Sequence, residues 1–149
     1  MSHMLRAFRP IACATAIVSM LATHAHAQQR MVTATVTNLA PTNSVSFARL
    51  HVGFHRGLFD SFNIGQTAGD GIISVAEAGS GARWQADFEE ADPTATRGIV
   101  GGTLTPGSSA SMSFLVNTGL NRFFSFASMV VPSNDFFLGN DNPMRASTA

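Results

Sequence analysis

The chain has 149 residues, which suffices for one domain with a single hydrophobic core and is too short for two. Its nine basic residues are all arginines and balance nine acidic residues, so the formal net charge is zero, and the sequence lacks the basic surface of a nucleic-acid-binding protein. The single cysteine, Cys13, lies in an apolar N-terminal segment, which excludes a disulfide, a thiolate metal site and a cysteine nucleophile from the rest of the chain.

The first 27 residues have the pattern of an export signal. Arg6 and Arg9 supply the positive end, residues 11–21 the apolar stretch, and residues 25–27 the small side chains of a cleavage site. We therefore expect a signal peptide over residues 1–27. The apolar stretch is too short for a membrane-spanning helix, which needs about 20 residues, so the mature protein is expected to be periplasmic or secreted, without a stable membrane span.

Two alternating segments near the start of the mature chain predict strands. Residues 31–37 alternate between small apolar side chains and threonines, a pattern typical of a strand with one face in solvent. Residues 48–55 also alternate, with apolar side chains on one face. The other face of this second strand carries His51 and His55 among its residues, and we expect that face to be exposed.

One short helix is expected at residues 70–79. Asp70 can cap its N-terminus, Gly79 can end it, and the apolar residues between them form one side. Residues 83–88, which include Trp84, are expected to form another strand, followed by an acidic loop.

The last part of the chain predicts two more strands. Residues 123–131 carry no charge, so we expect a central strand buried on both faces and ended by Pro132. Residues 111–116 alternate, and the short connection to residues 123–131 predicts an antiparallel hairpin. Short strands separated by turn signals predict an all-β fold, an antiparallel β-sandwich with one short helix, over residues 28–142. Residues 143–149 are expected to form a disordered tail.

Two groups of residues offer candidate sites before the last strand. His51 and His55 would lie about 13 Å apart on a strand, too far to bind one ion, so we expect them to be solvent-facing histidines. Four acids lie close together in the sequence: Asp87, Glu89, Glu90 and Asp92. They could edge a calcium site or supply the paired carboxylates of a hydrolase. The spaced ligands of a calcium loop are missing there, which favours a solvated acidic loop.

Asp135 is the most prominent candidate for a ligand-binding residue. It follows the predicted central strand directly and has Asn134 beside it. Its carboxylate can close its own turn or bind an ion. The residues alone favour the turn and leave both roles open.

Four segments of the chain resemble the spondin N-terminal domain family, and the last of them is the most specific. They are VTNLAPTN (residues 36–43), HVGFHRGLFDSFNIGQTA (51–68), VAEAG (75–79) and FSFASMVVPSNDFFLGN (124–140). The resemblance implies an antiparallel β-sandwich and an extracellular, adhesion-type role. It also implies a calcium ion near one end of the sandwich, with Asp135 as one ligand. In the family, further carboxylate ligands come from a later segment that has no counterpart here, so the resemblance implies weak calcium binding and an incomplete sandwich.

These observations predict a non-catalytic, exported recognition or adhesion module that binds an unidentified protein or cell-surface ligand. The sequence shows no converging set of nucleophile, base and orienting group. Two alternatives stay open at this point: an exported hydrolase that uses surface carboxylates, and a truncated, inactive fragment.

Overall fold

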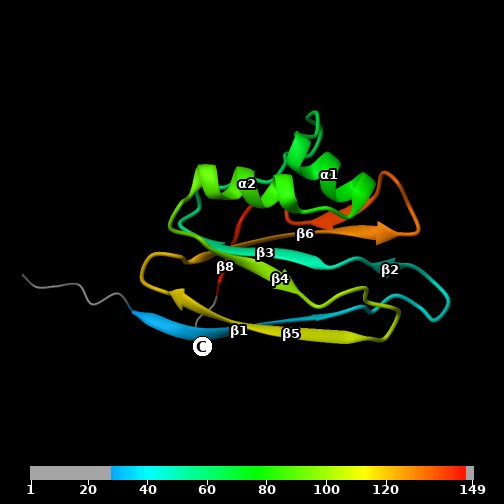
Figure 1. The fold of residues 1–149 in the computed structure, drawn as a ribbon, viewed down its shortest axis with the longest axis horizontal. Helices are drawn as coiled ribbons and strands as arrows, with labels where there is room; N and C mark the ends of the chain where they lie inside the picture. Colours follow the sequence, from blue (N-terminus) through cyan, green and yellow to red (C-terminus); the bar gives the residue numbers. More distant parts are fainter. Residues whose placement is uncertain (1–27, 147–149) are drawn as a thin grey trace, which may run out of the picture.

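The computed structural model describes residues 28–146. The predicted signal peptide lies outside the described residues. The strands form two layers, and two helices cover the outer face of the larger sheet (Figure 1). The smaller sheet pairs β1 (Gln29–Thr37) with β5 (Ser109–Asn117). The expected antiparallel β-sandwich is thus confirmed, with two helices, α1 (Asp70–Ala78) and α2 (Ala82–Ala91), in place of one.

The larger sheet is built around β6 (Phe123–Val131), which has the bounds expected for the central strand. One edge of β6 pairs with β3 (Leu50–His55) and β2 (Ser46–Phe47), and its other edge pairs with β7 (Phe137–Gly139) and β8 (Met144–Arg145). Strand β4 (Thr96–Val100) lies on the far side of β3.

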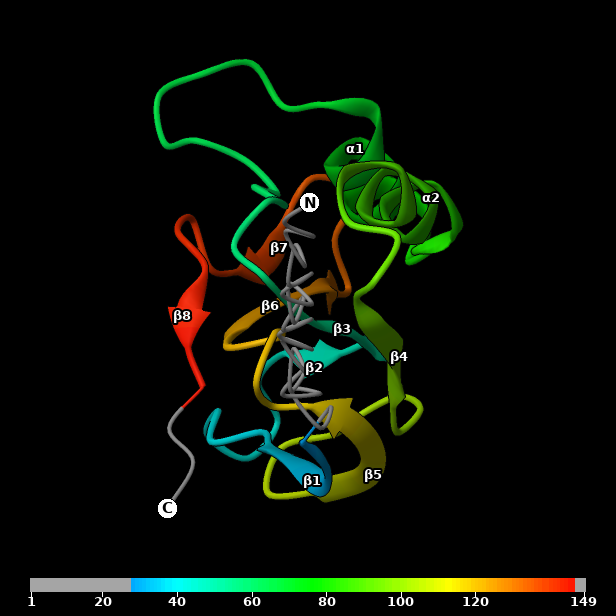
Figure 2. The ribbon, with the colours of Figure 1, turned by 90° about the vertical axis from the view of Figure 1, so that its left-hand side faces the viewer.

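Two cores hold the layers together, and they are separated by the larger sheet (Figure 2). The core between the sheets consists of Leu50, Val52, Phe54, Val100, Phe114 and Val116. The core between the helices and the larger sheet consists of Phe59, Ile72, Val75, Trp84, Phe88 and Ala127. A domain of this size without disulfides depends on such apolar burial for its stability.

The strand expected at residues 83–88 is wrong, because α2 occupies this segment. Trp84 and Phe88 are four residues apart and therefore lie on one face of the helix, where they are 1% and 0% exposed. Arg83 and Asp87 form an (i, i+4) ion pair of 2.7 Å on the outer side. The segment is thus an amphipathic helix whose apolar face consists of two large aromatic residues.

The hairpin expected between residues 111–116 and 123–131 is also wrong. β5 pairs with β1 over nine residue pairs, and the connection after Asn117 crosses to β6 in the other sheet. Three threonines of β1 meet three serines of β5 through hydroxyl hydrogen bonds of 2.8 Å: Thr33–Ser113, Thr35–Ser111 and Thr37–Ser109. Such cross-strand hydroxyl pairs favour this partner and this register.

The C-terminal segment is ordered where a disordered tail was expected. Met144 and Arg145 form β8 and pair with Phe124 and Phe123 of β6. The expectation is therefore wrong for these residues, while residues 147–149 lie outside the described part of the chain. None of the helices between residues 28 and 146 has the length and hydropathy required to cross a membrane.

Candidate functional site

Both histidines of β3 are buried, contrary to the expected exposed face. His51 is 3% exposed and His55 is 0% exposed, because α2 covers the side of the sheet that was expected to face solvent. Burial lowers the pKa of His51, and the nearby backbone of Gly79 offsets this lowering only in part. Neither ring nitrogen of His51 has a partner in hydrogen-bond geometry. Burial also lowers the pKa of His55, against the opposing effect of the charge of Asp92. Both rings are therefore neutral core side chains at pH 7.

His55 and Ser125 form the pair that most resembles part of a hydrolytic site. The imidazole nitrogen that faces Ser125 carries the ring proton, however, so it cannot accept the serine proton. The backbone N–H of Gly57 donates to Nδ1 of His55 at 3.2 Å, so the ring proton is on Nε2. Nε2 lies 3.1 Å from Oγ of Ser125 and donates to it. A base that activates a serine must accept the serine proton instead. Ser125 is also 1% exposed, so this pair is a structural contact.

The four acidic residues between Asp87 and Asp92 do not lie together in one solvated loop. Asp92 is 0% exposed and accepts hydrogen bonds from the backbone N–H of Arg56 at 2.9 Å and from Oγ1 of Thr94 at 2.6 Å. Burial by itself raises the pKa of Asp92, but these hydrogen bonds outweigh it and hold the pKa at about 2. Glu89 forms an ion pair of 3.0 Å with Arg97. The expected solvated loop is therefore wrong for Asp92, which fixes the end of α2.

Asp135 lies in the exposed loop between β6 and β7. Ser133 makes the hydrogen bonds that close this loop: its Oγ donates to the Val130 carbonyl at 2.6 Å and accepts from the backbone N–H of Phe136 at 3.2 Å. No hydrogen bond involves the Asp135 carboxylate in the described chain, so the turn is closed by the hydroxyl of Ser133 and not by Asp135. Among residues 28–146, no three His, Cys, Asp or Glu side chains gather as a metal site. Calcium takes six to eight oxygen ligands, and calcium binding at Asp135 stays a prediction.

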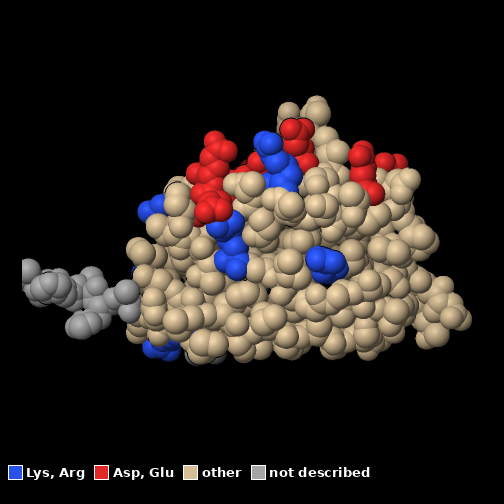
Figure 3. Space-filling model, in the orientation of Figure 1, with Lys and Arg blue, Asp and Glu red and all other residues tan. Residues whose placement is uncertain are grey.

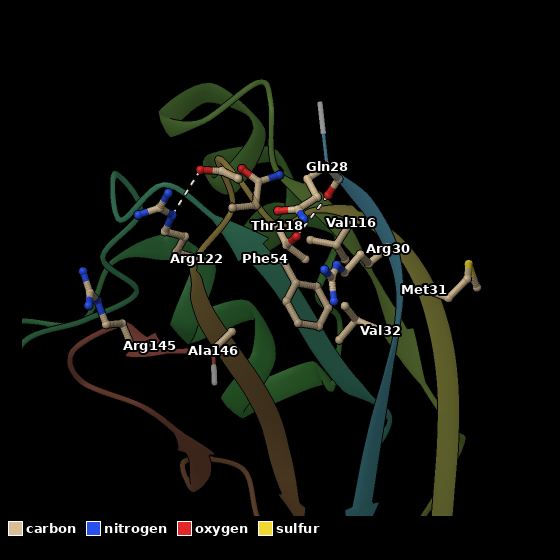
Figure 4. A pocket seen from close by; sticks show the side chains of 12 residues that line it. Gln28, Arg30, Met31, Val32, Phe54, Val116, Thr118, Arg122, Arg145 and Ala146 are labelled. Atoms are coloured by element: carbon tan, nitrogen blue, oxygen red, sulfur yellow. Dashed lines mark hydrogen bonds between the residues drawn. The ribbon is translucent and has the colours of Figure 1, made fainter. Parts of the chain in front are cut away.

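A cavity of about 750 Å³ opens between the two sheets, at the end where β1 begins (Figure 4). Its floor is apolar and includes Val32 and Phe54. Three arginines line its walls: Arg30, Arg122 and Arg145. No acidic residue contributes to the lining. The cavity therefore combines an apolar floor with a positively charged rim.

Arg30, Arg122 and Arg145, like the exposed Arg49, form no ion pair in the described chain. Arg56, Arg83 and Arg97 each form an ion pair with an acid. The described chain gives no such pair to the three cavity arginines. On the face seen in Figure 3 the acidic side chains lie over the helical layer, and the β1–β5 sheet contains no acidic residue. Within residues 28–146, therefore, no acidic side chain lines the cavity or forms an ion pair with its arginines.

Asn121 contributes a buried polar atom to the same cavity. The residue is 3% exposed and lines the cavity wall. Its Nδ2 donates to the Thr94 carbonyl at 2.9 Å, while Oδ1 has no hydrogen-bond partner among the described residues. A buried acceptor without a donor is costly, and because Oδ1 itself is buried it offers no direct contact to a ligand in the cavity.

An apolar groove of about 400 Å³ continues from the cavity along β1. One wall consists of β1, with Val32, Ala34 and Val36 turned towards the core. The opposite wall consists of side chains from β6 and β7: Phe124, Phe126 and Leu138. The sandwich is therefore open between β1 and β6, and the arginine cavity lies at one end of this opening (Figure 4).

Sequence reasoning missed this site because its residues come from three separate parts of the chain. Arg30 lies in β1, Arg122 precedes β6, and Arg145 lies in the segment expected to be disordered. The absence of acids from residues 28–58 is the one signal in the sequence that points towards a positively charged region.

The Spondin_N family model matches residues 17–143, which is most of the chain. The chain belongs to the spondin N-terminal domain family. This confirms the resemblance carried by the four segments above. No curated protein matches the chain. Spondin domains are typically extracellular, which fits an exported protein.

Proposed function

We propose that this spondin domain is a non-catalytic, exported recognition module that binds a protein or cell-surface partner through its arginine-lined cavity. One observation carries the proposal: Arg30, Arg122 and Arg145 all line one cavity, and none of them has an acidic partner in the described chain. Arginine binds carboxylate and phosphate groups in bidentate geometry, so a partner that presents an anionic group fits this cavity. Family membership supports an extracellular module in general.

The hydrolase alternative has less support than a binding role. His55 holds its proton towards Ser125. Asp87 and Glu89 form ion pairs, Asp92 is held by buried hydrogen bonds, and Glu90 is exposed. Neither arrangement offers an accessible base beside a nucleophile or a pair of carboxylates across a cleft.

Calcium at Asp135 stays part of the proposal as weak binding. The exposed carboxylate without a hydrogen-bond partner supports it, and the small number of acidic ligands nearby limits its affinity. The arginine cavity is independent of it, since Asp135 does not line that cavity.

Binding of the labelled protein to intact cells and envelope fractions of the producing organism tests the recognition role. The protein is expressed from its full sequence, and the triple variant Arg30→Gln/Arg122→Gln/Arg145→Gln is compared with Arg49→Gln. Arg49 is an exposed arginine outside the cavity and is the matched control. We expect saturable binding that weakens at least tenfold in the triple variant and is unchanged in the control. Equal binding by the two variants contradicts a role for the cavity, and hydrolysis of ester or peptide substrates that is lost in Ser125→Ala contradicts the non-catalytic assignment.

A further inference from the structure

We infer that the cavity and its groove bind an extended peptide, which adds to the free edge of β1 as an antiparallel strand and places its C-terminal carboxylate at the arginine-lined end of the cavity, beside Arg30. This inference rests on the proposed recognition function and names the class of partner. Three features carry it: the edge of β1, the apolar groove and the arginines that line the cavity.

The edge of β1 is open to pairing. β1 pairs with β5 along its whole length, Gln29–Thr37, without a bulge, and its other edge pairs with no described strand. Proteins commonly block such edges with proline, bulges or several charges. β1 has no proline, and its single charge is Arg30 at the cavity end. Figure 4 shows β5 on one side of β1 and the opening towards β6 on the other.

The groove beside this edge fits the alternating side chains of an added strand. Val32, Ala34 and Val36 face the groove, whereas the threonines between them are exposed. A strand beside β1 points every second side chain to the same face as these residues. Apolar side chains at those positions would enter the groove between β1 and the Phe124–Phe126 wall, so binding buries apolar surface from both partners.

The arginines set the direction of the added strand. Arg30 lies at the N-terminal end of β1, and Arg122 and Arg145 line the same cavity. An antiparallel strand has its C-terminus at that end, so its carboxylate lies beside Arg30, at the end of the cavity that Arg122 and Arg145 also line. A parallel strand would place its N-terminal ammonium group there, next to like charges.

The edge of β1 distinguishes a peptide from an apolar chain with an anionic head. The free backbone groups of β1 can pair with the N–H and C=O groups of a peptide. A fatty carboxylate fits the groove and the arginines, but it has no hydrogen-bonding groups for the edge of β1. The peptide accounts for all three features, and the lipid accounts for two.

The test uses a fluorescent peptide of about eight residues that alternates valine and threonine, because this length matches the pairing length of β1. It is synthesised with a free C-terminal carboxylate and, as its matched control, with a C-terminal amide. Affinity is measured by fluorescence anisotropy with the protein expressed from its full sequence. We expect the amide to bind at least tenfold more weakly than the acid. In the triple Arg→Gln variant the two peptides are expected to bind equally, and in Arg49→Gln the difference is expected to persist.

Hydrogen exchange of the complex locates the peptide. The amides of β1 that face the groove are expected to become protected when the acid peptide binds. Four outcomes would each overturn the inference: no binding at millimolar peptide, equal affinity for acid and amide, no protection of β1, or arginine-dependent binding of palmitate without binding of peptide. Protection of β1 that grows with protein concentration alone also overturns it, because a second copy then occupies the edge. If peptide binding fails while envelope binding still depends on the three arginines, the recognition function stands and the peptide is the wrong partner.

Discussion

The ring of Phe88 on α2 lies directly against the backbone of Gly53 in β3, at a distance that leaves no room for a Cβ at residue 53. Phe88 is 0% exposed, and it stacks on Phe59 with ring centroids 3.9 Å apart. The absence of a side chain at Gly53 thus lets α2 pack closely on the sheet. This contact holds the helical layer over the face of β3 that also carries His51 and His55.

Gly53→Ala is therefore expected to destabilise the fold. The added methyl group must displace Phe88 from a packed aromatic cluster, and overpacking of this kind costs about 1–3 kcal/mol. Gly102→Ala is the matched control, because nothing lies within 4 Å of its added Cβ. Its effect is expected to stay within about 0.5 kcal/mol. Urea unfolding measures both, and equal midpoints for the two variants contradict the packing argument.

Local pattern was sufficient for β1, β3, β5, β6 and the first helix, but not for the other strands, for α2 or for what packs on each face. Residues 123–131 form β6 with the expected bounds, since a continuous apolar run has few other solutions. The exposure of His51 and His55 was wrong because alternation shows which residues share a face and not what packs on it. The spacing of Trp84 and Phe88 suits a strand face as well as a helix face, and only the tertiary contact with Gly53 decides between them.

The candidate site could not be predicted from the sequence because it depends on topology. The connection between β5 and β6 looked like a hairpin by its length, yet it crosses between the sheets and leaves the opening beside β1. Arg122 lines the cavity because it directly precedes β6, and Arg145 lines it because β8 pairs with the start of β6. Asp135, the residue that the sequence singled out, lies outside this cavity and stays a predicted calcium ligand.

Asp92 is expected to contribute to stability in a defined acid range. Its pKa is about 2 in the folded protein and 3.8 as the ordinary value, so the folded state favours the ionised form. This contribution is present above pH 3.8 and is lost as the pH falls through about 2. This difference between the two pKa values corresponds to roughly 2 kcal/mol of the free energy of unfolding.

Asp92→Asn tests this contribution. The variant is expected to be less stable than the wild type at pH 7 by roughly 2 kcal/mol, and the difference is expected to shrink as the pH falls from 4 to 2. Denaturant titrations at several pH values measure it. Glu90→Gln is the control, since Glu90 is exposed and has no ion pair in the described chain. A pH-independent difference between wild type and Asp92→Asn contradicts the assignment.

The two buried histidines are expected to make the fold sensitive to mild acid. Burial lowers the pKa of both His51 and His55 below 6.5 in the folded state. The unfolded chain therefore binds more protons below about pH 6.5, and stability is expected to fall as the pH decreases from 7 towards 5. At pH 7.5 and above, both contributions are fully present.

His51→Leu separates one histidine from the other. Neither ring nitrogen of His51 has a hydrogen-bond partner, so an apolar side chain of similar size is expected to keep or raise the stability at pH 7.5. It is also expected to reduce the loss of stability between pH 7 and 5, with the remaining loss due to His55. Chemical denaturation between pH 7 and 5 measures how steeply the free energy of unfolding changes with pH in the wild type and in the variant. Identical slopes would show that His51 does not titrate differently in the two states.

Calcium is expected to raise the melting temperature only slightly, and only through Asp135. A ligand that binds the folded state alone adds about 0.4 kcal/mol when its concentration equals the dissociation constant, which corresponds to a rise of roughly 1–2 °C in a domain of this size. Calorimetry in millimolar calcium and in chelator measures the rise. Asp135→Asn is expected to abolish it, whereas Glu90→Gln, which removes one exposed charge elsewhere, is expected to retain it. Magnesium at equal ionic strength controls for general screening, and a rise that survives in Asp135→Asn would assign the ion to other ligands.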